Sequence, residues 1–129
     1  MIQSYFNEDL QILETTFSGN ITAADITEYL IEFKDNNAYP RKLRIITDTK
    51  GAIFNFSFKD LKTFNREKNK SLKNYNIVIS AIIINSPAAA ALSTLYGAIA
   101  NNKKYKFKVF STHEAALMWV ESFNFNLVN

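Results

Sequence analysis

Side chains that could do acid–base or nucleophilic chemistry are few, and one group of them stands near the C-terminus. His113 is the single histidine of the chain and follows Ser111 and Thr112. A histidine beside a hydroxyl residue could activate a nucleophile, but a catalytic triad also needs a carboxylate that orients the imidazole. Neighbours in the first turn of a helix point apart, and Glu114 already completes a capping box that begins at Ser111. We therefore predict an exposed histidine, no catalytic residues and no enzymatic activity.

The composition excludes several other kinds of site. The 129 residues include no cysteine and three glycines. A chain without cysteine has no disulfides, thiolate nucleophiles, cysteine zinc sites or iron–sulfur clusters. A single histidine rules out a multi-histidine metal centre, and neither GxGxxG nor GxxxxGK[ST] occurs. We expect no metal and no cofactor.

The strongest candidates for binding are polar residues at the expected ends of strands. Asp48 and Thr49 follow a short predicted strand, and Asn85 and Ser86 follow an almost uninterrupted apolar run over 77–84. In open α/β sheets, ligands bind beyond the carboxyl ends of the strands. Aspartate is also frequent in turns, so Asp48 has a second interpretation as a residue that stabilises a loop.

Ser57 begins the pattern Ser57-Phe-Lys-Asp60, which is typical of the capped start of a helix. Capping alone explains a serine here. A phosphate on Ser57 would lie at a helix N-terminus, where backbone N–H groups and the helix dipole favour anions. Ser57 is therefore also a candidate phosphorylation site.

Three phenylalanines alternate along this part of the chain, at Phe54, Phe56 and Phe58. Alternating aromatic residues next to a strand usually belong to the core. They are also side chains of the kind that line small-ligand sites, so an apolar pocket at these three residues is a second interpretation.

The apolar pattern predicts the elements that position these residues. The chain is 47% hydrophobic and 21% charged, as expected of one globular domain over 1–129. Strands are predicted over 2–6, 10–17, 43–47, 77–84 and 107–110, with a hairpin turn at 7–9 and a break after the second strand at 18–20. Helices are predicted to begin at Thr22, Ser57, Ser86 and Ser111.

The helical periods predict which residues face inward. The helix from Ser57 places Lys68 on the same stripe as Leu61 and Phe64. The helix from Ser86 is expected to bury Ala88, Ala91, Leu92, Leu95, Tyr96 and Ile99. The last helix is expected to bury Ala116, Trp119, Val120 and Phe123.

The order β-β-α-β-α-β-α-β-α predicts an α/β fold with a single small mixed, mostly parallel sheet and helices packed on it. Right-handed crossovers would gather the helix N-termini, with Thr22, Ser57, Ser86 and Ser111, at the carboxyl edge of the strands beside Asp48.

Three segments, in this order and spacing, resemble the STAS/SpoIIAA-like domains: Phe17-Ser-Gly-Asn-Ile-Thr22, the strand that ends at Asp48, and Glu114-Ala-Ala-Leu-Met-Trp-Val120. These domains are relatives of the anti-sigma-factor antagonists and, in fold, of the CRAL-TRIO lipid-transfer domains. The resemblance covers about residues 10–122 and implies a SpoIIAA/STAS-like fold. It also implies a regulatory or ligand-binding module. The antagonists carry Asp-Ser-Ser or Asp-Ser-Gly at the start of their second helix, where this chain has Asn55-Phe-Ser-Phe-Lys-Asp60.

The first functional hypothesis is accordingly a non-enzymatic domain that docks a protein partner at the pole formed by strand C-termini and helix N-termini. The alternative is a module of the same fold that binds a small apolar ligand or a lipid. The partner itself is unknown from sequence, and a homodimer is compatible with it. No secretory signal is visible, so we expect a cytoplasmic protein.

Basic residues are concentrated in one part of the chain, which has a net charge of +3. Ten of its 15 lysines and arginines lie within 59–108, together with two acidic residues. Lys68, Lys70, Lys73, Lys103 and Lys104 are expected to cluster at the pole opposite the helix N-termini. Lysines at helix C-termini and edge strands have structural roles. The functional interpretation of the basic cluster is peripheral contact with an anionic membrane. Binding of nucleic acid is not expected, because no nucleic-acid-binding motif accompanies the basic residues.

Overall fold

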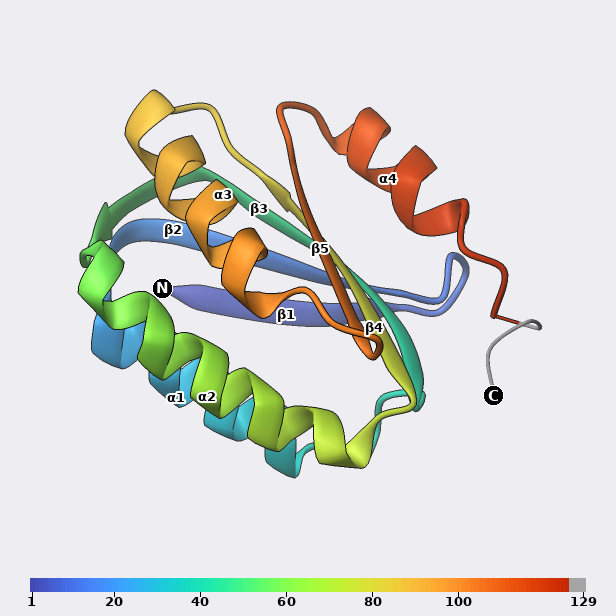
Figure 1. Cartoon of the computed structure of the whole chain (residues 1–129). Coiled ribbons are helices and arrows are strands. Elements are labelled where there is room, and N and C mark those ends of the chain that lie inside the picture. The colour runs from blue at the N-terminus through green and yellow to red at the C-terminus, as the bar shows by residue number, and fades with distance from the viewer. Residues whose placement is uncertain (126–129) are drawn as a thin grey trace.

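The structure is a computed structural model that describes residues 1–125, and these form a five-stranded sheet with four α-helices (Figure 1). The strands lie across the sheet in chain order: β1 (Ile2–Asn7), β2 (Ile12–Thr22), β3 (Lys42–Asn55), β4 (Ile77–Ile83) and β5 (Tyr105–Phe110). β1 pairs antiparallel with β2, and the other neighbouring pairs are parallel. The predicted mixed, mostly parallel sheet is confirmed, with β1 and β5 at its edges.

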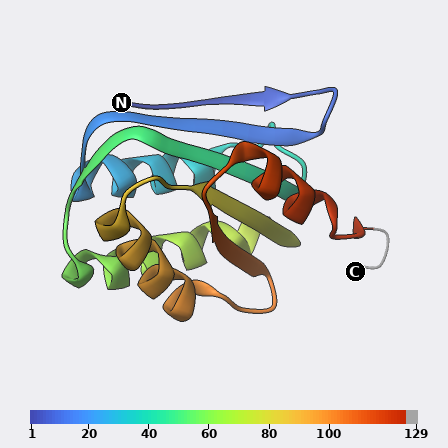
Figure 2. The same cartoon turned by 90° about the horizontal axis from the view of Figure 1, so that it is seen from above.

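The helices divide between the two faces of the sheet (Figures 1 and 2). α1 (Ala23–Asp35), α2 (Leu61–Ser71) and α3 (Pro87–Ala100) lie on one face, as right-handed crossovers between neighbouring parallel strands require. Short 3-10 turns, Phe58–Asp60 and Leu72–Asn74, flank α2. α4 (His113–Glu121) covers the other face, where its Ala116 and Val120 pack against isoleucines of the sheet.

Four helix starts carry the expected kind of cap. Thr22 forms a capping box with Asp25, and Ser57 forms one with Asp60. Ser86 accepts from Ala89 N at 3.1 Å, with proline at the first helical position. The last cap differs from the prediction: Thr112, and not Ser111, accepts from the backbone, at Ala115 N.

β2 and β3 are both longer than predicted. The break expected at residues 18–20 does not occur, because β2 continues to Thr22 with Gly19 at φ +71°. β3 likewise does not end at Asp48 but runs to Asn55. The polar and glycine signals in both segments belong to an irregular stretch of strand rather than to loops.

A β-bulge explains this irregularity. Between the pairs Thr16–Asp48 and Ser18–Gly51, β2 contributes one residue and β3 contributes two, Thr49 and Lys50. An extra residue inverts the alternation of side chains. Ile45 and Thr47 face α1–α3 before the bulge, and Phe54 faces the same side after it.

The buried face of α3 differs in part from the predicted one, although Leu92 and Tyr96 face inward as expected. Ser93, Gly97 and Ala100 are buried, whereas Leu95 and Ile99 are 52% and 47% exposed. The helix lies so close to β5 that a Cβ on Gly97 would come within 3.1 Å of Phe107 Cδ1. Small residues face the sheet because larger ones would not fit there. Among residues 1–125, no helix is both long and apolar enough to cross a membrane.

Candidate functional site

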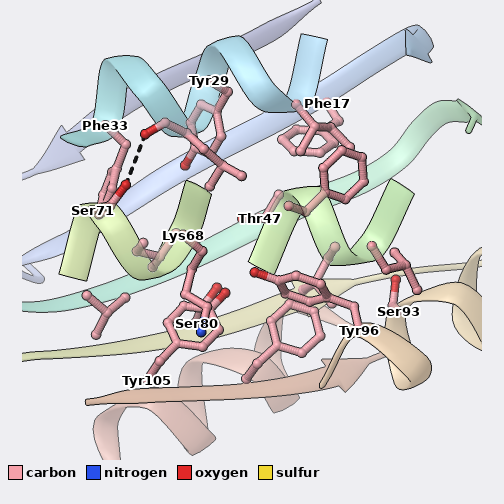
Figure 3. Close-up of a pocket in the computed structure, with 18 of the residues that line it drawn as sticks. Phe17, Tyr29, Phe33, Thr47, Lys68, Ser71, Ser80, Ser93, Tyr96 and Tyr105 are labelled. Atoms are coloured by element: carbon pink, nitrogen blue, oxygen red, sulfur yellow. Dashed lines mark hydrogen bonds between the residues drawn. The ribbon is translucent and has the colours of Figure 1, made fainter. Parts of the chain in front are cut away.

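A pocket of about 120 Å³ lies between the sheet and the helices of its three-helix face, and it is partly open to solvent (Figure 3). β2 to β5 form its floor, and α1, α2 and α3 form its walls. Most of its lining is aromatic or aliphatic: Phe17, Ile26, Tyr29, Leu30, Phe33, Ile45, Phe54, Phe56, Leu61, Phe64, Leu72, Val78, Ile82, Leu92, Tyr96, Tyr105 and Phe107. Polar side chains in the lining are Thr47, Lys68, Ser71, Ser80 and Ser93.

Helical spacing brings the wall residues together. α1 presents Ile26, Tyr29, Leu30 and Phe33, which recur at three- and four-residue intervals along one face. α2 presents its inward stripe from Leu61 to Ser71, and the Ser71 hydroxyl ties the two helices together by donating to Leu30 O at 3.1 Å. Packing and this side-chain-to-backbone bond therefore hold α1 and α2 together.

The three phenylalanines considered for a pocket take two different positions. Phe54 and Phe56 line it, with ring centroids 5.0 Å apart, and Phe56 meets Phe64 edge to face at 5.2 Å. Phe58 is 63% exposed and lies outside it. The sequence pattern did not show that the bulge in β3 turns Phe54 toward the helices.

Lys68 is the one charged residue of the lining, and it is 3% exposed. Its Nζ donates to Ala100 O at 2.7 Å and to Asn69 Oδ1 at 2.8 Å, and lies 4.4 Å from the centroid of the Tyr105 ring. Burial lowers the pKa of Lys68 to about 8. The sequence placed Lys68 on the inward stripe of α2. Nothing in the sequence indicated that Ala100 O, at the end of α3, would accept its hydrogen bond.

The tyrosines of the pocket remain neutral at physiological pH. Burial raises the pKa of Tyr29 to about 12, and it raises the pKa values of Tyr96 and Tyr105 above their usual range. The Tyr29 hydroxyl lies 3.4 Å from Thr15 Oγ1. The tyrosines can donate or accept hydrogen bonds to a bound molecule but add no charge to the pocket.

Asp48 and Thr49 lie at the bulge, and their side chains form hydrogen bonds with backbone groups. Asp48 Oδ1 accepts from Lys50 N at 2.9 Å, which satisfies an amide beside the irregular pairing. Thr49 is 4% exposed and its Oγ1 donates to Ile83 O at 2.7 Å. Asp48 points away from the pocket side, since its neighbour Thr47 lines the pocket.

The predicted pole is formed in part. Asp48 pairs in register with Ile83 of β4, and Ile83 with Phe110 of β5, so Asp48 lies level with the strand ends that Asn85 and Ser111 follow. Asn85 and Ser86 are exposed just beyond β4. Ser57 is exposed two residues beyond the end of β3, and Asn55 is seven residues from Asp48 along that strand. At about 3.3 Å per residue this separation is roughly 23 Å. The structure does not bring Asp48 and Ser57 together.

The C-terminal group of candidate residues is exposed and forms a pair that the sequence did not reveal. His113 Nε2 lies 3.3 Å from both carboxylate oxygens of Glu14 on β2. Ser111 is exposed in the turn before α4. Within residues 1–125, no three histidine, aspartate or glutamate side chains are grouped so that they could hold a metal ion.

The predicted basic cluster is smaller than expected. Lys73, Lys103 and Lys104 border one shallow depression with Asn69 and Asn102. Lys68 is not a member, because its ammonium is turned inward.

Comparison with known proteins identifies the architecture. No protein-family model matches the sequence, and no curated protein matches it. A solved structure of an uncharacterized DUF3478-family protein with a SpoIIAA-like fold, from Shewanella loihica PV-4, is similar to this chain at a TM-score of 0.60. The similarity covers 93% of this chain and 92% of the other, at 17% sequence identity. At that identity the comparison establishes the fold, which agrees with the predicted SpoIIAA-like architecture.

Proposed function

We propose that this chain, a domain with the SpoIIAA-like fold, binds a small apolar molecule in the pocket between its sheet and α1–α3. The observation that carries the proposal is a cavity of about 120 Å³ with an almost entirely apolar lining. Cavities of about 150 Å³ lined by apolar side chains stay dry and admit benzene. A single ring or a short aliphatic chain is therefore the expected size of ligand. In this proposal the domain is a binding module and not an enzyme.

The energy of an empty cavity supports the same proposal. Core cavities cost about 24 cal/mol per Å³, so a fully enclosed void of this size would cost about 3 kcal/mol, and the open side of this pocket reduces that cost. Whole domains are stable by only about 5–15 kcal/mol. A bound apolar molecule that fills the space would therefore add noticeably to the stability of the fold.

The experiment measures toluene binding to the purified protein by thermal shift, with native mass spectrometry of the freshly purified protein to detect any bound molecule. We expect toluene to raise the Tm in a saturable manner, because binding to the folded state alone stabilises it. Ser93→Phe places a ring in the pocket and should abolish the shift. Thr94→Phe, at the exposed neighbouring position of α3, is the matched control and should preserve it. No Tm shift in the parent would contradict the proposal.

Partner docking is a second candidate function, and two exposed apolar side chains favour it. Ile53 and Phe58 are 70% and 63% exposed, and both lie within four residues of the exposed Ser57. Exposed apolar groups beside a capped helix start are features of a protein-binding surface, and a phosphate on Ser57 would change its charge. This candidate keeps the regulatory role that the sequence resemblance implies, in the form of a protein partner at the far end of β3.

Variants at Ser57 test the docking candidate. Ser57→Asp keeps a capping oxygen, while Ser57→Ala removes it. The assay is pull-down from the native cell extract with each variant and with Phe58→Ser. Docking at this end predicts that Phe58→Ser loses the captured partner and that Ser57→Asp changes its amount. Equal capture by the parent and all three variants would exclude this surface.

A further inference from the structure

Lys68 is a buried cation without a buried anion. It is 3% exposed, yet the ion pairs among residues 1–125 involve Arg66 and Lys70 with Glu67, and His113 with Glu14. None of these reaches the Lys68 ammonium. Charged side chains are almost never fully buried unless they are paired, because removal from water strongly disfavours the charge.

The contacts that Lys68 does make are neutral. Its ammonium has three N–H groups, and two neutral oxygens, Ala100 O and Asn69 Oδ1, accept from it. The face of the Tyr105 ring lies beside it at 4.4 Å. These groups hold the ammonium in place but leave its charge uncompensated.

The position of the Lys68 ammonium in the pocket determines which part of a bound molecule it could contact. Figure 3 shows the Lys68 side chain reaching from α2 toward the floor of the pocket, where Ser80 and Tyr105 lie beside its nitrogen. The Phe54, Phe56 and Phe64 rings pack against one another in the same lining. The pocket thus combines one cationic group with a cluster of aromatic rings.

We propose that the pocket takes a small monocarboxylate whose apolar body lies among the aromatic rings and whose carboxylate pairs with Lys68. This inference rests on the proposed apolar-ligand binding and adds the class of ligand. A monoanion fits because a single lysine supplies one positive charge, and a dianion would bring a second, unpaired charge into an apolar site. The body can be aliphatic or aromatic, since the lining contains both kinds of side chain.

The experiment compares each acid with its neutral amide of nearly the same shape: hexanoate with hexanamide, and benzoate with benzamide. Dissociation constants are measured by calorimetry or by NMR titration at pH 7. We expect at least one of the acids to bind about tenfold or more tightly than its amide, because a hydrogen bond to a charged group is stronger than a neutral one. The pair that shows the larger ratio identifies an aliphatic or an aromatic body.

Two variants with the same substitution assign the effect to Lys68. Lys68→Met removes the charge and should make acid and amide bind equally, with the amide affinity retained. Lys70→Met lies on the same helix but is exposed, and it should keep the parent's preference.

A pH series on the parent protein gives a test that needs no variant. Above pH 8 the affinity for the acid should fall, roughly tenfold by pH 9.5, while the affinity for the amide stays constant. The other titratable groups of the pocket lining are Tyr29 from α1, Tyr96 from α3 and Tyr105 from β5, whose pKa values are raised by burial and which stay neutral over this range. Glu67, the preceding residue of α2, is paired with Lys70.

The outcomes separate this inference from the proposed function. Equal binding of acid and amide by the parent would overturn the carboxylate inference and leave apolar binding supported. An acid preference that survives in Lys68→Met, or that does not decline above pH 8, would also overturn it. Toluene, acids and amides all failing to bind would reject the proposed function itself.

Discussion

Thr47→Ile tests whether the pocket is empty space, through the stability of the ligand-free protein. Thr47 is 7% exposed on β3, and its side chain lines the pocket. Isoleucine keeps the β-branched shape that suits a strand, keeps the γ2 methyl group, and replaces the hydroxyl by a methylene that carries one further methyl group.

The expected change in the free energy of unfolding follows from the volume available in the pocket. Burial of one additional methylene-sized group stabilises a protein by about 0.8 kcal/mol, and replacement of a buried hydroxyl by an apolar group adds to this. A void of about 120 Å³ can receive the added group without overpacking. We expect the free energy of unfolding to rise by about 1 kcal/mol, which is a Tm increase of about 4 °C for a domain of this size.

The assay is urea denaturation followed by circular dichroism, with thermal melting as a second measurement. Thr16→Ile is the matched control, since Thr16 is exposed on β2 and undergoes the same chemical change. We expect it to alter stability by less than about 0.5 kcal/mol. If Thr47→Ile instead destabilised the protein by 1–3 kcal/mol, as overpacking does, the space beside Thr47 would be filled in solution and the reasoning would be wrong.

Two further variants test the polar contacts that hold the helices. Arg44→Met should destabilise the protein by about 2 kcal/mol in urea denaturation, because Arg44 donates to Val120 O at 2.8 Å and to Phe123 O at 2.5 Å at the end of α4. An unchanged denaturation midpoint would show that these hydrogen bonds add nothing to stability. Lys68→Met should change the pH dependence of stability. The pKa of Lys68 is lower in the folded protein, so the unfolded chain binds more protons between pH 8 and about 10.5. The stability of the parent should therefore rise with pH across that window relative to the variant. Parallel curves for the two proteins would mean that Lys68 does not titrate differently on folding.

The parts of the fold that could be predicted from sequence are those with local causes. The Thr22–Asp25 box and the Ser86-Pro87 start are single-turn signals, and the structure has both. The apolar run at 77–84 indicated a strand covered on both faces, and β4 is buried throughout. Alternation of strands and helices was then enough to predict the parallel sheet.

The parts that failed depend on contacts distant in the chain. The small residues of α3 face inward because Phe107 on β5 approaches Gly97. The spacing of apolar residues within the helix does not indicate that approach. Asp48 had the composition of a turn, but the residues that follow it pair with β2 through a bulge. The pocket could be predicted only in part: Phe54 and Phe56 were candidates for its lining, whereas the presence of Lys68 in the same lining depends on three helices and four strands at once.

The bulge at Thr49 and Lys50 has a consequence for how this sequence tolerates insertions and deletions. Lys50 is exposed and stands between Thr49 and Gly51, so it looks like a loop position at which the loss of a residue would be harmless. Because the alternation of a strand has a period of two, a deletion there that restored regular pairing would rotate every later residue of β3 to the opposite face. Phe54 would leave the pocket and the exposed Ile53 would enter it, with no change in the composition of the lining strand. Loss of one codon at this site would therefore rearrange the binding site, whereas loss of the exposed Asn37 after α1 would shorten a surface connection.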